Sequence, residues 1–401
     1  MESCRIIAAA VLFFSVYVIQ CRQNLVVRGV PEDGPLNFTA LASKYGHSVE
    51  EYDVVTEDGY ILKLFHIPGY RSQPVLLMHG IIDSADTFII RGEGSLAITL
   101  ANEGYDMWAG NSRGSRYSRR HITLDPDVDK KYWDFSFHDS GYYDLPAMID
   151  FILDKTAQRK LSAIGHSQGN TIFYVLGSTR PEYNEKINVM IAISPVCFIN
   201  NPSPTIQTLI TLSPLIDSVL EGFGQEEVFN DNSSLRPLIK AICAQKNFGY
   251  AICAHGVLFL IGGSDPEEME EDFLPIVVEY YPSGTSRKNS LHVAQVAVRK
   301  KFVQFDYGAR KNLDLYNTTY PSKYDLGKVT MRVALLFGSN DGIVSLKDVR
   351  LLRRNLPNVV VYRMMEHKKF NHIDAVWGRN MKKYLFPHIF EILEKYNTPV
   401  R

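Results

Sequence analysis

The sequence lacks an excess of charge of either sign, an internal repeat and any low-complexity segment. Its 401 residues include 43 lysines and arginines against 44 aspartates and glutamates, which gives a net charge of −1 at pH 7. This balance gives no reason to expect nucleic acid or an anionic membrane as the main partner. The absence of repeats and biased segments argues against a solenoid and against a disordered linker. The composition, 45% hydrophobic and 22% charged, is that of an ordinary globular protein.

The hydrophobic run near the N-terminus is too short for a membrane span. It covers 14 positions, residues 6–19, whereas a helix needs roughly 20 to cross a bilayer. Arg5 precedes this run and Gln20 follows it. The pattern predicts a cleaved signal peptide over residues 1–21, with a retained signal anchor as the alternative, because no small-x-small motif marks a cut. We therefore expect no stable membrane anchor.

Cysteine is scarce, with five in the chain. If the leader is removed, three are certain to remain, Cys197, Cys243 and Cys253, so one thiol stays free. Cys243 and Cys253 are close in sequence and could close a short loop. Three sequons for N-glycosylation also suit a secretory route. They lie at Asn37, Asn232 and Asn317.

Strand-like and helix-like segments alternate along most of the chain. A hairpin is expected over residues 50–65, around the turn at 57–59. Apolar runs that predict buried strands cover residues 74–78, 161–164, 189–193, 333–337 and 359–364. Helical spacing covers residues 142–153, 170–176 and 374–396. The tract 104–121 is dense in Gly, Arg, Asn and Ser and is expected to be an ordered loop. The alternation predicts an α/β fold with a mostly parallel, doubly wound sheet.

The alternation is interrupted once, between Cys197 and about Tyr320. Prolines break the apolar segments there, and no clear βα rhythm is visible. We interpret residues 197–320 as a helical cap inserted between two parts of the core, residues 22–196 and 321–401. The acidic run 267–272 is expected to be a solvated helix face and not a metal site.

The pentapeptide Gly165-His166-Ser167-Gln168-Gly169 joins an apolar run to a helix-like run. A strand, a sharp turn and a helix with serine at the apex form the context of a G-x-S-x-G nucleophile elbow. The glycines fit this turn because the strand and helix pack too closely for Cβ atoms. Ser167 is therefore the candidate nucleophile.

A serine hydroxyl needs a base and an orienting acid to act as a nucleophile. In such a fold the chain order is Ser, then Asp or Glu, then His. Asp341 follows the buried run 333–337, and His372 precedes the last helix, so both lie where ligand-facing loops gather. His367 in the same loop is the alternative base. Two other acids are less suited, since one is too near His372 in sequence and the other is expected inside a helix: Asp374 and Asp348.

Acyl transfer also places negative charge on a carbonyl oxygen, which two backbone N–H groups normally hold. One comes from the residue after the nucleophile, here Gln168, and one from a loop after an earlier strand. Residues 79–81, His-Gly-Ile, directly follow the apolar run 74–78. Ile81 is therefore the second candidate donor, and the alternative interpretation of this tripeptide is a simple turn.

From about Tyr45 to its C-terminus the chain resembles the animal acid lipases of the α/β-hydrolase fold, which include gastric and lysosomal acid lipases. Besides the Ser167 elbow and His79-Gly80-Ile81, the motifs that carry the resemblance are Glu57-Asp58-Gly59-Tyr60-Ile61-Leu62, Gly104-Tyr105-Asp106-Met107-Trp108, Gly110-Asn111-Ser112-Arg113-Gly114, Trp133-Asp134-Phe135-Ser136-Phe137, Tyr143-Asp144-Leu145-Pro146-Ala147, Pro282-Ser283-Gly284-Thr285-Ser286 and Asn371-His372-Ile373-Asp374.

The resemblance implies a lipase that hydrolyses neutral lipid esters, triacylglycerols and also cholesteryl esters, at a lipid–water interface without a cofactor or metal. It implies a movable lid in the cap over an apolar acyl site, and secretion, into the gut lumen for example, or delivery to the lysosome. It selects His372 over His367. The residues it assigns are the triad Ser167, Asp341 and His372, the oxyanion donors Ile81 and Gln168, and a cap disulfide between Cys243 and Cys253.

The chain departs from the family pattern at a few positions. Ile81 stands where leucine is usual, which is immaterial to a backbone donor. Ala375 replaces a common aromatic residue and is expected to widen the pocket. His138-Asp139 replaces a usual acidic pair, and no role is assigned to it. The motifs do not choose the acyl chain, so an esterase or thioesterase of smaller substrates is the alternative enzyme, and a non-catalytic lipid carrier is the alternative outside enzymes.

Overall fold

The computed structural model describes residues 36–229 and 236–397. The predicted signal peptide, residues 1–21, and the sequon at Asn232 lie outside these ranges. Within them, no helix combines the length and apolar character needed to cross a bilayer.

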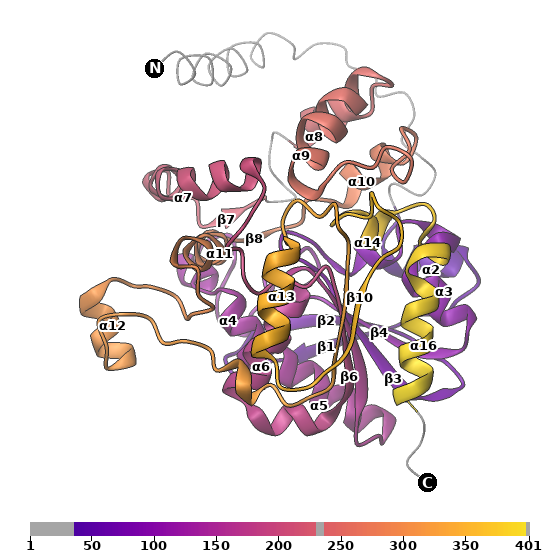
Figure 1. The fold of residues 1–401 in the computed structure, drawn as a ribbon, viewed down its shortest axis with the longest axis horizontal. Helices are drawn as coiled ribbons and strands as arrows, with labels where there is room; N and C mark the ends of the chain where they lie inside the picture. Colours follow the sequence, from indigo (N-terminus) through magenta and orange to yellow (C-terminus); the bar gives the residue numbers. More distant parts are fainter. Residues whose placement is uncertain (1–35, 230–235, 398–401) are drawn as a thin grey trace.

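A large sheet forms the centre of the protein (Figure 1). It has eight strands, in the order β1-β2-β4-β3-β5-β6-β9-β10. β1 and β2 form the predicted hairpin, in which Glu50 lies opposite His66 and Val55 lies opposite Ile61. β2 is also antiparallel to β4, and the remaining neighbours are parallel. The strands are β1 (Glu50–Val55), β2 (Ile61–Ile67), β3 (Arg71–Met78), β4 (Tyr105–Gly110), β5 (Leu161–His166), β6 (Ile187–Ile193), β9 (Val333–Phe337) and β10 (Val359–Met364).

The strand β4 corrects the prediction that residues 104–121 form a loop. All of Tyr105–Gly110 is buried between β2 and β3. Asp106, a poor strand residue, is accommodated because its carboxylate accepts hydrogen bonds from His66 Nε2 at 2.6 Å and from Trp108 Nε1 at 2.8 Å. The partner His66 lies 40 residues away in sequence, so local composition could not reveal it.

Helices cover both faces of the sheet (Figure 1). Alternation along the strands divides the core: Ile164 and Ile191 face one hydrophobic cluster, and Ala163 and Met190 face the other. The first cluster includes residues of α2 (Phe38–Lys44), α3 (Leu96–Asn102), α14 (Asp374–Trp377), α15 (Met381–Tyr384) and α16 (Phe386–Tyr396). The second includes residues of α4 (Phe137–Asp139), α5 (Leu145–Thr156), α6 (Gln168–Thr179) and α13 (Leu346–Asn355).

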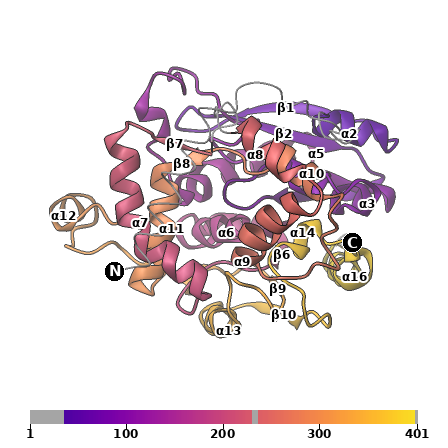
Figure 2. The same cartoon turned by 90° about the horizontal axis from the view of Figure 1, so that it is seen from above.

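Between β6 and β9 the chain leaves the large sheet for a long segment. β6 ends at Ile193 and β9 begins at Val333, and no strand of the large sheet lies between them. Seen from above, several helices of this segment lie over the sheet (Figure 2). The described elements of the segment are α7 (Pro204–Gly222), β7 (Glu227–Val228), α8 (Arg236–Cys243), a π-helical segment (Tyr250–Leu258), α9 (Phe259–Gly262), α10 (Leu274–Tyr280), β8 (Thr285–Ser286), α11 (Arg287–Arg299), α12 (Ala309–Tyr316) and a 3₁₀ helix (Leu326–Lys328). The cap boundaries at 197 and 320 stay a prediction.

Two local predictions are wrong in part. The acidic run 267–272 forms turns and no helix, and within it Glu268 is buried because its carboxylate accepts hydrogen bonds from the Asn380 N–H at 2.7 Å and from Asn380 Nδ2 at 2.8 Å. The helix predicted over residues 374–396 is three short helices, α14, α15 and α16. Gly378 and Pro387 account for breaks that the periodicity alone does not show.

Candidate active site

Ser167 lies at the sharp turn between β5 and α6, as predicted. Its backbone has φ 55° and ψ −120°, a combination that is strained for a residue with a side chain. The Ser167 N–H donates to Ile193 O at 3.2 Å, which fixes the turn against β6. A strained serine at a strand-to-helix turn is the nucleophile-elbow geometry, which places the hydroxyl at the end of the sheet; Ser167 itself is buried here, at 6% exposure.

The glycines around Ser167 are required by close contacts. A Cβ on Gly169 would lie 2.2 Å from Met78 O, and one on Gly165 would lie 2.7 Å from Asn170 Oδ1. A Cβ on Gly80 would lie 3.1 Å from the Ser167 Cβ. The loop after β3, which carries Ile81, therefore passes directly beside the serine.

Asp341 and His372 form a buried hydrogen-bonded pair at the ends of β9 and β10. His372 Nδ1 lies 2.9 Å from Asp341 Oδ2. Asp341 Oδ1 accepts the backbone N–H groups of Ile343 at 2.9 Å and Val344 at 2.8 Å. Burial by itself would raise the pKa of Asp341, but His372 and the two N–H groups outweigh it and hold that pKa below its usual value. Asp341 is thus an ionised acceptor, which leaves His372 Nε2 as the nitrogen able to accept a proton.

His166 connects the serine turn to the histidine loop. Its Nε2–H donates to His372 O at 2.9 Å, and the two imidazole rings lie 4.9 Å apart between centroids. Burial, followed by the nearby His372, lowers the pKa of His166 to about 3. A neutral His166, the residue directly before Ser167, therefore fixes the backbone of His372 by this hydrogen bond. This contact spans 206 residues, and sequence reasoning identified His166 only as a neighbour of Ser167.

A second neutral histidine organises the loop after β3. His79 Nδ1–H donates to Gly80 O at 2.8 Å, and its Nε2 accepts the Ser112 N–H at 3.1 Å. Burial lowers the pKa of His79 to about 4, so one tautomer with both nitrogens engaged is favoured. Within residues 36–229 and 236–397, neither the Ile81 N–H nor the Gln168 N–H donates to another protein group. Both N–H groups are thus unoccupied by the described protein groups.

The side chain of Gln168 is hydrogen-bonded to Asn289. Gln168 Oε1 accepts Asn289 Nδ2 at 3.0 Å, and Asn289 is fixed in turn by Thr285 Oγ1 at 3.0 Å and the Ser286 hydroxyl at 2.9 Å. Asn289 lies on α11, far from Ser167 in sequence, and no motif pointed to it.

The alternative residues have other partners. His367 Nε2 hydrogen-bonds to Asp265 Oδ2, and its ring stacks on Tyr384. Asp374 accepts the Asn371 N–H at 3.1 Å, and burial, with the neighbouring Asp265, raises the pKa of Asp374 to about 8. Asp348 lies in α13, as predicted, and accepts the Asn201 N–H at 3.0 Å. Within residues 36–229 and 236–397, the histidine that hydrogen-bonds to Asp341 is His372 and not His367.

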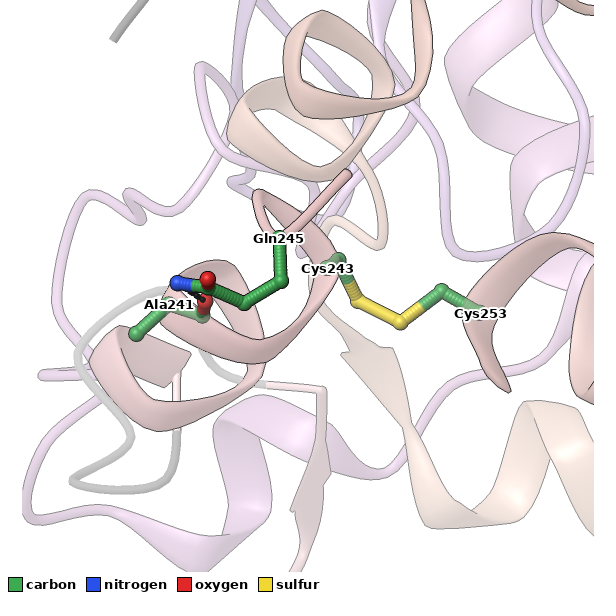
Figure 3. The surroundings of a disulfide bond; sticks show 4 residues. All are labelled: Ala241, Cys243, Gln245 and Cys253. Carbon is green, nitrogen blue, oxygen red and sulfur yellow. Dashed lines mark hydrogen bonds between the residues drawn. A yellow bond between two sulfur atoms is a disulfide. The ribbon is translucent and has the colours of Figure 1, made fainter. Parts of the chain in front are cut away.

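The structure contains the disulfide between Cys243 and Cys253, with their Cα atoms 5.7 Å apart. It ties the end of α8 to the π-helical segment (Figure 3), where Gln245 Nε2 also donates to Ala241 O at 3.3 Å. Cys197 is the buried free thiol. The sequons at Asn37 and Asn317 are exposed, the first at the start of α2 and the second at the end of α12.

Comparisons with known proteins agree with this fold. Residues 73–375 match a family described as "alpha/beta hydrolase fold", and residues 38–92 match a "Partial alpha/beta-hydrolase lipase region". Lipase 1 of Drosophila melanogaster is 36% identical over 369 residues, covering 92% of this chain and 82% of its own. A Crotalus adamanteus protein named for lysosomal acid lipase/cholesteryl ester hydrolase is 32% identical, covering 92% and 93%. The crystal structure of a bacterial membrane phospholipase A shares the fold, with a TM-score of 0.50 and 15% identity over 99% of this chain and 100% of its own.

Proposed function

This chain belongs to the animal acid lipase family of the α/β-hydrolase fold, and we propose that it hydrolyses triacylglycerols and cholesteryl esters with Ser167, His372 and Asp341 as its catalytic triad. Membership makes it a serine hydrolase that acts on carboxylic esters of lipids. The observation that carries the proposed triad is the strained Ser167 turn beside a buried Asp341–His372 pair, which has the chain order of this fold.

The proposed reaction follows from the roles of these groups. His372 Nε2 accepts the Ser167 hydroxyl proton as the oxygen attacks the ester carbonyl, and ionised Asp341 stabilises the resulting imidazolium. The N–H groups of Ile81 and Gln168 donate to the tetrahedral oxyanion. His372 then protonates the leaving alcohol, an acyl-Ser167 remains, and water activated by the same His372 releases the fatty acid.

An apolar cap surface supports long acyl chains as the substrate class. Several large apolar side chains of the segment between β6 and β9 are solvent-exposed, which is uncommon unless the surface meets another apolar phase. On α7 and directly after it they are Leu209, Leu212, Leu215, Ile216, Val219 and Phe223. We propose that residues 197–320 form the cap that covers the acyl site and that this exposed row meets the lipid substrate.

The disulfide supports an oxidising compartment, because disulfides are rare in reducing ones. We propose that residues 1–21 are a cleaved signal peptide and that the protein is secreted or delivered to the lysosome. Glycosylation at Asn37 and Asn317 fits the same route, since both are exposed.

A serine-directed fluorophosphonate tests the catalytic assignment. Wild type is expected to label, and Ser167→Ala is expected not to. Ser339→Ala is the matched control, because it removes a hydroxyl that donates to Lys368 O at 3.0 Å in the loop before Asp341. Absence of Ser167-dependent labelling would favour a non-catalytic lipid carrier.

The substrate class is tested by turnover of emulsified triacylglycerol, cholesteryl ester and short soluble esters or thioesters across roughly pH 4 to 8, the range of histidine titration. Hydrolysis of the emulsions supports the proposal. Activity restricted to short soluble substrates would favour the esterase or thioesterase alternative.

A further inference from the structure

A short segment at the end of helix α9 lies between the loop that carries Asp341 and the loop that carries His372. Gly262 is the last residue of α9. Its carbonyl oxygen accepts two hydrogen bonds, from the Gly342 N–H at 3.1 Å and from the His372 N–H at 3.0 Å. The Gly262 oxygen therefore contacts Gly342, which follows the proposed catalytic acid Asp341. It also contacts His372, the proposed catalytic base.

The next two residues fit tightly between the same loops. Gly263 has φ +109°, and a Cβ there would lie 2.1 Å from Asn340 O and 2.6 Å from the Asn371 Cβ. Ser264 O accepts Asn340 Nδ2 at 3.0 Å, and that amide also donates to Lys369 O at 3.0 Å. Asn340 and Asn371 directly precede Asp341 and His372, so the segment packs against both catalytic residues' neighbours.

Asp265 completes the contact with the histidine loop. Its side chain is fully buried and hydrogen-bonds to His367 Nε2. Within the described parts of the chain its second oxygen, Oδ1, has no hydrogen-bond partner, so a buried carboxylate is kept here at a cost in desolvation. The His367 ring is held from its other side by Tyr384, at 4.6 Å between centroids. His367 is thereby fixed five residues before His372.

We infer that residues 262–265 are a positioning element for the triad, in which Gly263 and Asp265 set the place of His372 relative to Asp341. The inference rests on the proposed triad. These residues do not touch the reacting atoms; they hold the two loops at the separation that the Asp341–His372 hydrogen bond requires. Since α9 belongs to the segment between β6 and β9, any shift of that helix reaches the acid and the base through Gly262 O.

The glycine test uses two glycines with the same kind of backbone strain and different surroundings. Gly263→Ala adds a methyl group that must displace Asn340, whereas Gly308 also has a positive φ, +84°, and a Cβ added there would have no atom within 4 Å. Gly308→Ala therefore carries the strain alone. Displacing a catalytic group by about 1 Å costs about 100-fold in rate, so we expect kcat of Gly263→Ala to fall about 100-fold with KM nearly unchanged, and kcat of Gly308→Ala to stay near wild type.

The rates are measured on a soluble ester and divided by the number of serines that a fluorophosphonate labels at completion. This correction removes any loss caused by unfolded protein, which a merely structural role would produce. Equal kcat per labelled serine in Gly263→Ala and Gly308→Ala would overturn the inference. Absence of Ser167-dependent labelling in wild type would instead overturn the proposed function.

A second pair keeps the inference falsifiable if Gly263→Ala does not fold. Asp265→Asn retains an oxygen that can accept from His367, and Asp265→Ala does not. We expect kcat per labelled serine to fall about tenfold or more in Asp265→Ala and to recover most of that loss in Asp265→Asn. Glu267→Ala is the control, since Glu267 contacts the same loop through exposed Lys369 at 3.0 Å. A loss in Asp265→Ala no greater than in Glu267→Ala would contradict the role of Asp265.

Discussion

Asp374 is expected to make the stability of the protein depend on pH. Its carboxyl is buried beside Asp265 and Glu268, and its folded-state pKa is about 8 against an ordinary value of 3.8. A carboxyl with a raised folded pKa stays protonated in the fold while the unfolded chain ionises. The free energy of unfolding therefore falls as the pH rises from about 4 to 8, and it rises again on acidification.

The size of the effect follows from the separation of the two pKa values. At 1.36 kcal/mol per unit, Asp374 costs about 4 kcal/mol at pH 7 and about 2 kcal/mol at pH 5. Asparagine has the shape of the protonated acid and an oxygen that can still accept the Asn371 N–H. Asp374→Asn should therefore stabilise the protein by up to about 4 kcal/mol at pH 7, by about 2 kcal/mol at pH 5, and by well under 1 kcal/mol near pH 4.

Urea unfolding of wild type and Asp374→Asn at pH 4, 5, 6 and 7 measures this difference. Asp134→Asn is the control for the loss of one acidic side chain, because Asp134 is 65% exposed and its ion pair with Lys288 lies on the surface. A stability difference between Asp374→Asn and wild type that does not grow between pH 4 and pH 7 would refute the reasoning, and so would destabilisation at pH 7.

Three further results are expected. Asp341→Asn should lower kcat about 10⁴-fold with the fold intact, because the wrong His372 tautomer is then favoured; a loss under tenfold in a steady-state ester assay would count against Asp341 as the acid. His79→Ala should lower kcat by about 10²–10³, the typical effect of losing one oxyanion donor, since His79 fixes Gly80 beside Ile81, and an unchanged kcat would show that this loop needs no such support. Replacing both Cys243 and Cys253 by serine should lower the free energy of unfolding by about 2–3 kcal/mol for so short a loop, and urea unfolding that matches wild type would contradict it.

The sequence predicts most of the sheet because its central strands are short apolar runs with turn residues at their ends. Residues 333–337 and 359–364 coincide with β9 and β10. The sequence did not predict β4, because Asp106 is buried by hydrogen bonds to His66 and Trp108 that form only in the folded protein. The burial of Glu268 within an acidic run has the same cause, since Asn380 lies 112 residues away.

Chain order together with the family resemblance, which selects His372 over His367, identifies the residues proposed for chemistry, but not those that hold them in place. Ser167, Asp341 and His372 each follow a predicted strand, so the topology alone orders them. His166, His79 and Asn289 act through contacts with residues far along the chain or through their tautomer, which no motif contains. The sequence therefore predicts the proposed reacting residues but not the residues that hold them in position.

Buried neutral histidines, two of which hold the proposed site, make the stability of the protein depend on pH in the acid range. Burial favours the neutral state of His79 and His166, and also of His292, a histidine of α11 outside the site whose Nε2 hydrogen-bonds to Val303 O at 2.9 Å. Their folded pKa values are about 4, 3 and 3. A histidine whose folded pKa is depressed destabilises the protein as the pH falls below 6.5. Between pH 7 and pH 5 each of the three lowers the free energy of unfolding by about 2 kcal/mol, or about 6 kcal/mol together.

Two buried carboxyls oppose this loss. The pKa of Asp83 is raised to about 7 by burial, and that of Asp374 to about 8, so together they return about 5 kcal/mol over the same interval. The contributions of these five groups nearly cancel between pH 7 and pH 5, so Asp83 and Asp374 offset most of the cost of keeping the buried histidines neutral. Asp374→Asn would remove half of that compensation, so the variant that is more stable at pH 7 should be the one that loses more stability on acidification.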